Sequence, residues 1–251
     1  MGRPLAILTP GGDKVSESFA ALDNEFAGIA ESAARAGLGD DAVPSVHRAW
    51  VTVPGDEHIS AVVWGPGPPE VVFVHEAGRS ARAWDEVALR LGRPSVAIDL
   101  PGHGRSDWRR DGRNEPRQLA GTLAEAIRSL APRVSLVVGG GLGGRTSLAL
   151  ITTPRPTFLP RVALIDTLPG TAVDSLFDDV TLWEELAGLE NPAFVIHGEH
   201  SGRLTAADLV DLERRAPRVA VITIPGAAED VVASEPARLA SELNRLASQG
   251  E

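Results

Sequence analysis

Short, fully apolar runs alternate along most of this chain with longer stretches in which apolar residues recur every three or four positions. Apolar runs of this length are typical of buried strands, and the second pattern is typical of amphipathic helices. The predicted strands are Val71–His75, Ser95–Asp99, Val134–Val138, Arg161–Ile165, Ala193–His197 and Val219–Ile224. Strands alternating with helices predict an α/β fold, a mostly parallel twisted sheet with helices on both faces.

The same patterns place an antiparallel hairpin before the alternating region and a helix after most strands. The hairpin strands are Ala49–Val53 and Ile59–Trp64, which flank a Pro-Gly-Asp turn. The predicted helices are Ala83–Leu91, Pro116–Leu130, Val173–Leu189, Ala206–Ala216 and Pro236–Ala247, with another after the strand Val134–Val138. We therefore expect one α/β domain over residues 46–251.

Residues 1–45 are predicted to form an N-terminal helical extension. Within Ser16–Ala36, apolar residues including Phe19, Leu22 and Phe26 recur at helical spacing, with a serine N-cap and Gly37 as the stop. This helix could pack on the surface of the main domain, cover a pocket as a lid, or pair two copies as a homodimer. The sequence leaves these three alternatives open.

Composition excludes several classes of function. The net charge of −10 leaves no basic excess to neutralise phosphates, so we expect no nucleic-acid partner. The absence of cysteine excludes disulfides and thiolate metal sites. No signal peptide or membrane-spanning run is evident, which predicts a cytoplasmic protein with no membrane partner. A small-molecule ligand or substrate is the expected partner.

Four segments carry a more specific pattern. They are Val71–Leu91 with the sequence VVFVHEAGRSARAWDEVALRL, Val96–Asp107 with VAIDLPGHGRSD, Val137–Gly144 with VVGGGLGG, and the two late strands continuing into HGEHSG and IPGAAED. In this order and spacing the chain resembles the α/β-hydrolase superfamily, from about Trp50 to the C-terminus. The resemblance implies the α/β-hydrolase fold. Only Asp166–Pro192 is available for a cap between two late strands, so the cap is expected to be minimal.

The resemblance also implies where a Ser-Asp-His triad would stand. The serine of the G-x-S-x-G nucleophile elbow falls on Gly141, the acid on Ser201 and the histidine on Glu229. Glycine offers no nucleophile, and a serine mechanism needs a nucleophile, a base and a group that orients the base. We therefore expect serine-triad hydrolysis to be absent. Asp166, directly after the predicted strand Arg161–Ile165, could serve as the acid that some members of the superfamily place there.

Other groups near the elbow could still perform chemistry. Glu76 stands where the family usually has glycine, directly after His75. We predict that Glu76, Glu229 and His75 supply acid–base catalysis, because two carboxylates in a half-apolar pocket would raise each other's pKa. The predicted substrate-binding positions are Gly141, Leu142, Glu76 and Ala77, with the Leu142 N–H at the former oxyanion position. Alternatively, Glu229 is solvated or pairs with an arginine such as Arg79, Arg82 or Arg203.

No metal or cofactor is expected. His75, His103, His197 and His200 lie on loops at one sheet edge, but no recognised ligand spacing supports a metal site. Gly139, Gly141 and Gly144 fit a G-x-G-x-x-G dinucleotide loop only weakly, because no acidic residue ends a strand about twenty residues further on.

These observations predict a catalytically degenerate protein that binds or converts a small apolar or carbonyl-bearing molecule in the former active-site pocket. The favoured interpretation is a non-hydrolytic enzyme, such as a cyclase, isomerase or lyase. The alternatives are a pseudoenzyme that acts as a receptor or interaction module, and a weak hydrolase that uses a carboxylate-activated water.

Overall fold

The computed structural model describes residues 25–152, 160–170 and 179–249. Eight strands form one sheet in the order β1-β2-β4-β3-β5-β6-β7-β8. Strand β2 runs antiparallel to β1 and β4, and all other neighbouring strands are parallel. The strands are β1 (Val46–Val53), β2 (Glu57–Trp64), β3 (Val71–Val74), β4 (Ser95–Ile98), β5 (Leu136–Gly140), β6 (Arg161–Ile165), β7 (Ala193–Gly198) and β8 (Ala220–Ile224).

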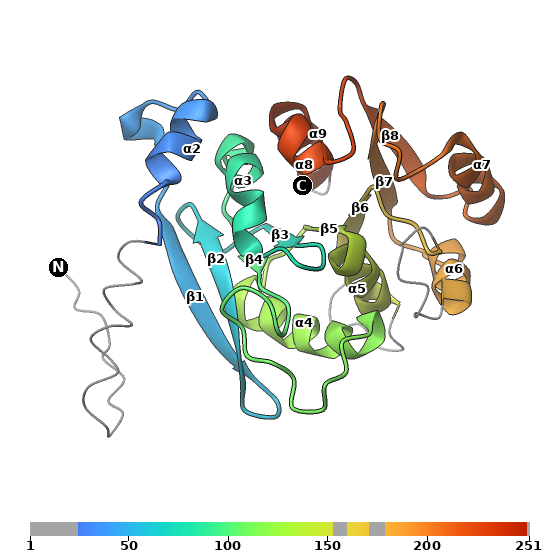
Figure 1. Cartoon of the computed structure of the whole chain (residues 1–251), viewed down its shortest axis with the longest axis horizontal. Coiled ribbons are helices and arrows are strands. Elements are labelled where there is room, and N and C mark those ends of the chain that lie inside the picture. The colour runs from blue at the N-terminus through green and yellow to red at the C-terminus, as the bar shows by residue number, and fades with distance from the viewer. Residues whose placement is uncertain (1–24, 153–159, 171–178, 250–251) are drawn as a thin grey trace.

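Helices cover both faces of this sheet (Figure 1). Helices α2, α3, α8 and α9 contribute to one apolar cluster, and α4, α5, α6 and α7 contribute to the other. Their bounds are α2 (Ile29–Arg35), α3 (Asp85–Leu91), α4 (Pro116–Leu130), α5 (Gly141–Ile151), α6 (Asp179–Ala187), α7 (Ala206–Arg215), α8 (Val231–Ser234) and α9 (Pro236–Ser248), with 3-10 turns η1 (Asp40–Ala42) and η2 (Ala81–Trp84). The predicted mostly parallel α/β sheet with two helical layers is confirmed.

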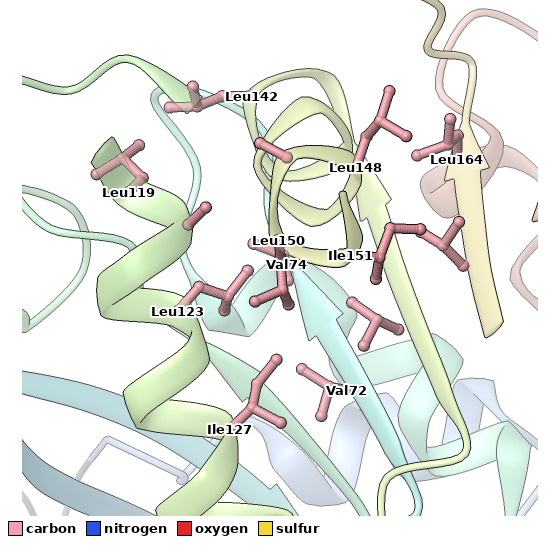
Figure 2. Packing of buried hydrophobic residues seen from close by; sticks show 14 of the residues in the cluster. Val72, Val74, Leu119, Leu123, Ile127, Leu142, Leu148, Leu150, Ile151 and Leu164 are labelled. Atoms are coloured by element: carbon pink, nitrogen blue, oxygen red, sulfur yellow. The ribbon is translucent and has the colours of Figure 1, made fainter. Parts of the chain in front are cut away.

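The two-residue periodicity of the central strands produces these two clusters. In β3, Val72 and Val74 face the α4–α5 layer, whereas Val71 and Phe73 face the α3–α9 layer. Figure 2 shows Leu119, Leu123 and Ile127 of α4 directed toward Val72, Val74 and the residues of α5. Fully burying each such side chain contributes about 1.5–3 kcal/mol. This double-sided packing fixes the central strands, and therefore fixes the loops at their carboxyl ends.

The N-terminal region differs from its prediction in extent. Residues 25–28 form turns, and α2 begins at Ile29 and stops before Gly37, which has the positive φ of 77° expected of a helix stop. Helix α2 packs on α3, with Ala33 buried in the same cluster as Val87. The predicted helical positions Phe19 and Leu22, and the N-cap serines, lie outside the described residues. The lid and homodimer alternatives remain predictions.

The connection between β6 and β7 contains α6, and residues 171–178 of the predicted helix Val173–Leu189 lie outside the described residues. The other predicted elements occur within a few residues of their expected bounds. Among the described residues, no helix is both long and apolar enough to cross a bilayer.

Candidate active site

The elbow predicted around Gly141 is a sharp turn from strand to helix. Strand β5 ends at Gly140, and α5 begins at Gly141, whose φ is +52°. This left-handed value is the conformation that glycine adopts without strain. The Gly141 N–H donates to Thr167 Oγ1 at 2.6 Å, and that hydroxyl donates to the Ile165 carbonyl oxygen at 2.6 Å. Thr167 therefore fixes the elbow to the end of β6.

Close packing explains two more glycines of the run Gly139–Gly144. A Cβ on Gly139 would lie 2.6 Å from the Gly143 carbonyl carbon, and a Cβ on Gly143 would lie 2.4 Å from the Val74 carbonyl oxygen. Both contacts are shorter than backbone atoms can tolerate, so glycine is needed at both positions. These contacts bring α5 against the end of β3, where Glu76 follows.

Glu76 fills the space beside the elbow. A Cβ on Gly140 or Gly141 would lie 3.2 Å from the Glu76 Cγ atom in either case, so the two glycines leave room for the glutamate side chain. Arg203, from the loop after β7, forms an ion pair with the Glu76 Oε1 atom. Both side chains are about one-third exposed. The elbow therefore has the Glu76 side chain beside the space that a side chain at position 141 would need.

Asp166 is a second carboxyl group at the same sheet edge. It follows β6 directly, is only 7% exposed, and has a φ of +44°, which is uncommon for a non-glycine residue. Its Oδ1 accepts a hydrogen bond from the Gly198 N–H at 3.3 Å, and its carboxyl group also hydrogen-bonds the Ser201 side chain. Burial raises the pKa of Asp166 to about 6, although these hydrogen bonds and the nearby Arg203 oppose that shift.

A small cavity of about 50 Å³ opens beside Glu76 and Gly140. Apolar side chains of Ala83, Trp84, Val232 and Ala233 form part of its wall. The polar lining comes from Glu76, His75 and the ion pair of Arg79 with Asp230, in which nitrogen and oxygen are 2.7 Å apart. A cavity with both apolar and polar lining is therefore present beside the end of the elbow strand, and of the predicted substrate-binding positions only Glu76 lines it.

Both ring nitrogens of His75 form hydrogen bonds with backbone groups. Its Nε2 accepts from the Leu100 N–H at 3.0 Å, which assigns the proton to Nδ1, and Nδ1–H donates to the Glu76 carbonyl oxygen at 2.7 Å. Burial lowers the pKa of His75 to about 4. The ring is thus held neutral, with neither nitrogen available to a substrate, which argues against the predicted acid–base role.

Glu229 is exposed, and its Oε1 lies 3.6 Å from where a Cβ on Gly202 would stand. The residue that lines the cavity is its neighbour, Asp230. The three arginines considered as partners of Glu229 pair elsewhere: Arg79 with Asp230, Arg82 with Asp85, and Arg203 with Glu76. The expected pairing of Glu76 and Glu229 is therefore replaced by the pairing of Glu76 with Arg203.

The remaining predicted positions lie close to the elbow. The Leu142 side chain is buried in the core, so only its backbone can face a substrate; as a first-turn residue of α5, its N–H has no partner within the helix. Ala77 is exposed directly after Glu76. Ser201 is nearly buried, and its Oγ accepts from the Arg203 N–H at 3.3 Å.

The predicted histidines have separate surroundings. The rings of His75 and His103 lie 5.0 Å apart, the His197 Nε2 contacts Thr223 Oγ1 at 2.9 Å, and the His200 Nε2 is 3.9 Å from Glu199. Within residues 25–152, 160–170 and 179–249, no group of three histidine or acidic side chains has the arrangement of a metal site.

Sequence reasoning missed the roles of Arg203 and Thr167 and gave Asp166 only a secondary place. The available signal was their position: Asp166 and Thr167 follow β6, the neighbour of the elbow strand β5, and Arg203 lies in the loop after β7, the next strand in the sheet. Such positions line the crevice where ligands bind in open α/β sheets.

Comparison with known proteins places this architecture in a class. No protein-family model matches the chain. Sequence similarity is found to the esterase Rv0045c of Mycobacterium tuberculosis, 41% identical over 147 residues, and to the lipase LipV of the same organism, 32% identical over 113 residues. These matches cover 59% and 44% of this chain, and 47% and 41% of the relatives. The matched regions thus span less than half of the relatives' own length.

Structural similarity extends further. The crystal structure of the Rv0045c esterase superposes with a TM-score of 0.77 at 29% identity, covering 88% of this chain and 97% of that one. The eight-stranded sheet, its helical layers and this similarity establish the α/β-hydrolase fold. Named esterases with this degree of similarity point to a hydrolase. The prediction of a non-hydrolytic enzyme or a pseudoenzyme is therefore wrong.

Proposed function

We propose that the protein is an ester hydrolase that binds the ester carbonyl group at the elbow and uses a water molecule as the attacking nucleophile. The observation that most directly supports this function is the position of Glu76, whose side chain fills the space over Gly140 and Gly141. A carboxylate there stands where an elbow side chain would attack. The similarity to esterases supports hydrolysis, and the glycine at position 141 favours water over a side-chain nucleophile at this turn.

In this mechanism the ester carbonyl oxygen lies toward the N-terminus of α5. The Leu142 N–H, unpartnered within the helix, would donate to the oxygen as it becomes negatively charged, and the exposed backbone of Ala77 flanks the same space. Glu76 accepts a proton from water as the water oxygen attacks the carbonyl carbon. Arg203 orients the Glu76 carboxylate before the reaction through their ion pair.

The residues at the other two triad positions support the same proposal. Ser201 accepts a hydrogen bond from the Arg203 backbone and bonds to Asp166, and Glu229 is exposed beside Gly202. A histidine base is missing at position 229, so an activated serine of the Ser-Asp-His type is not the proposed nucleophile.

The test is hydrolysis of short p-nitrophenyl and methyl esters by the full chain and by the Glu76→Gln variant. We expect kcat/KM of Glu76→Gln to fall by about 100-fold or more, the usual contribution of a general base. The matched control is Glu213→Gln, which removes the same charge from the exposed surface of α7 and should keep wild-type rates.

Two further measurements make this proposal falsifiable. Glu229→Gln, measured in parallel, is expected to lose less than Glu76→Gln because Glu229 is exposed and lies beside Gly202, whereas Glu76 lies beside the elbow glycines. A serine-directed fluorophosphonate is expected to leave the protein unlabelled. No turnover of any ester, full activity of Glu76→Gln, or stoichiometric fluorophosphonate labelling would each contradict the proposal.

A further inference from the structure

Asp166 lies between two residues that contact the elbow. The preceding residue, Ile165, places its carbonyl oxygen 3.6 Å from where a Cβ on Gly140 would stand. The following residue, Thr167, accepts the Gly141 N–H at 2.6 Å. The backbone of Asp166 therefore cannot move independently of the turn at which the ester is proposed to bind.

The conformation of Asp166 is specific as well. A non-glycine residue in the left-handed region costs free energy and persists only where surrounding contacts hold it there. Here the Gly198 N–H, the Ser201 side chain and the backbone bond from the Asp166 N–H to the Ile196 carbonyl oxygen, 2.9 Å, hold it. Backbone strain of this kind concentrates at functional sites, which makes Asp166 a candidate for a direct role in the reaction.

Arg203 gives the two carboxyl groups different electrostatic environments. Its guanidinium is paired with Glu76 directly, whereas it acts on Asp166 only through space. Glu76 is about one-third exposed and Asp166 is nearly buried. The charged groups that act on Asp166 are Arg203, which favours its ionised form, and Glu76, which opposes it. An ion-paired carboxylate next to a buried carboxyl group is the arrangement that separates a base from an acid.

We infer that Asp166 is the proton donor to the leaving alcohol in the hydrolysis proposed above, an inference that rests on that proposed function. Water forms a bond to the carbonyl carbon while one of its protons passes to Glu76. As the tetrahedral intermediate collapses, the carbon–oxygen bond to the alcohol breaks, and the proton of Asp166 passes to the departing oxygen. The products are a carboxylic acid and an alcohol. Glu76 then releases its proton to solvent and Asp166 takes one up, which restores both groups.

This role has a pH signature that a structural carboxyl group would not have. Because burial raises the pKa of Asp166 to about 6, the group is protonated below this pH and ionised above it. Hydrolysis of esters with poor leaving groups should therefore decline as the pH rises through about 6. Esters of acidic phenols, whose oxygen leaves without protonation, should show no such decline.

The experiment compares kcat/KM for a series of acetate esters whose alcohols range from methanol to p-nitrophenol. In Asp166→Asn we expect methyl acetate hydrolysis to fall by about 100-fold or more, and p-nitrophenyl acetate hydrolysis to fall less than about threefold. The rate of the variant should thus depend more steeply on leaving-group acidity than that of the wild type. Asp211→Asn, a change of the same chemistry on the exposed surface of α7, is the control and should retain the wild-type dependence.

The outcomes are distinguishable from those of the parent proposal. Equal loss for all leaving groups in a folded Asp166→Asn variant would overturn the donor role while leaving ester hydrolysis intact. No turnover of any ester by the wild type would instead reject the proposed function. If the variant does not fold, the wild-type pH profiles decide: identical profiles for methyl and p-nitrophenyl acetate would reject the donor role.

Discussion

Glu76 and Asp99, which stand at the two ends of the segment from β3 to β4, each pair with an arginine. Comparison of these two clusters shows what separates a structural ion pair from a reactive one. At the start of the segment, Glu76 pairs with Arg203 beside a cavity, and both side chains are about one-third exposed. At its end, Asp99 pairs with Arg48 at 2.7 Å, and their side chains are 0% and 5% exposed. The residue types are alike, and the surroundings differ.

The buried cluster is saturated with hydrogen bonds. Asp99 accepts from the Ala81 N–H at 2.6 Å and from the Arg105 N–H at 3.3 Å, in addition to Arg48 and the Ser60 hydroxyl. Arg48 also pairs with Glu25. Every member has its partners within the fold, so none is left to bind a substrate. In the second pair, the Glu76 carboxylate has Arg203 as its partner and lines a cavity of about 50 Å³, which leaves room for a water molecule.

The largest expected effect comes from breaking the buried cluster. Arg48→Met leaves the buried Asp99 carboxylate without its cation and leaves Glu25 with the 3.5 Å ion pair to Arg105, which should lower the free energy of unfolding by about 3–5 kcal/mol. Urea denaturation measures this loss. The control, Arg214→Met, breaks an exposed pair with Asp211 and should change stability by less than about 1 kcal/mol. If Arg48→Met and Arg214→Met both changed the free energy of unfolding by less than about 1 kcal/mol, burial would not distinguish the Arg48–Asp99 cluster from an exposed ion pair.

A smaller effect is expected from the buried carboxyl group of the reactive region. Folded Asp166 keeps its proton up to about pH 6, whereas the unfolded group loses it near its ordinary value of 3.8. The folded state therefore binds more protons between these values, and the contribution of Asp166 to stability falls as the pH rises from about 4 to 6. Asp166→Asn removes this dependence.

The free energy of unfolding of the wild type, relative to Asp166→Asn, should thus fall by about 2 kcal/mol between pH 4 and pH 7. His75, with a lowered pKa of about 4, has the opposite dependence, losing stability as the pH falls from 6.5. That dependence is common to both proteins and cancels in the difference. Urea denaturation across the pH range measures the difference; a constant value would show that Asp166 is not a proton-binding group in the fold.

The smallest effect on stability is expected for Arg203→Met. Since the Glu76–Arg203 pair is partly exposed, the free energy of unfolding should change by less than about 1 kcal/mol. Its effect on the pH profile should be clear, because Arg203 lowers the pKa of Asp166. The decline in methyl ester hydrolysis should move to higher pH in Arg203→Met. If Arg203→Met lost as much stability as Arg48→Met, or if the pH profile of methyl ester hydrolysis did not move, the Glu76–Arg203 pair would be a structural ion pair like Asp99–Arg48.

The fold was predictable because apolar periodicity reports burial directly. Continuous apolar runs such as Val71–Val74 are buried on both faces, and the glycines at 139 and 143 mark the contact of α5 with β3. The elbow and Glu76 could also be placed, because they follow predicted strands immediately. Function was mispredicted because a glycine at position 141 was taken to end hydrolysis, whereas comparison with known esterases points to a hydrolase.

Side-chain pairing at the site could not be predicted, because it depends on directions that chain position does not encode. Glu229 and Asp230 are adjacent, and only Asp230 lines the cavity. Arg203 was one of several arginines near the expected pocket. It pairs with Glu76 and not with Glu229 because of the direction that the loop after β7 gives to its side chain. The burial and positive φ of Asp166 likewise arise from the packing of β6 against β7.

The contact between Glu76 and the glycines at 140 and 141 couples these positions through side-chain volume. A serine introduced at 141 would place its Cβ 3.2 Å from the Glu76 Cγ atom, on a backbone whose φ of +52° already favours glycine. A side chain at 141 therefore requires the glutamate to shift or to be replaced by a smaller residue. Substitutions at 76 and 141 should be epistatic, with Gly141→Ser better tolerated when residue 76 is small than when it is glutamate. The side chains at 76 and 141 thus share one volume across the turn.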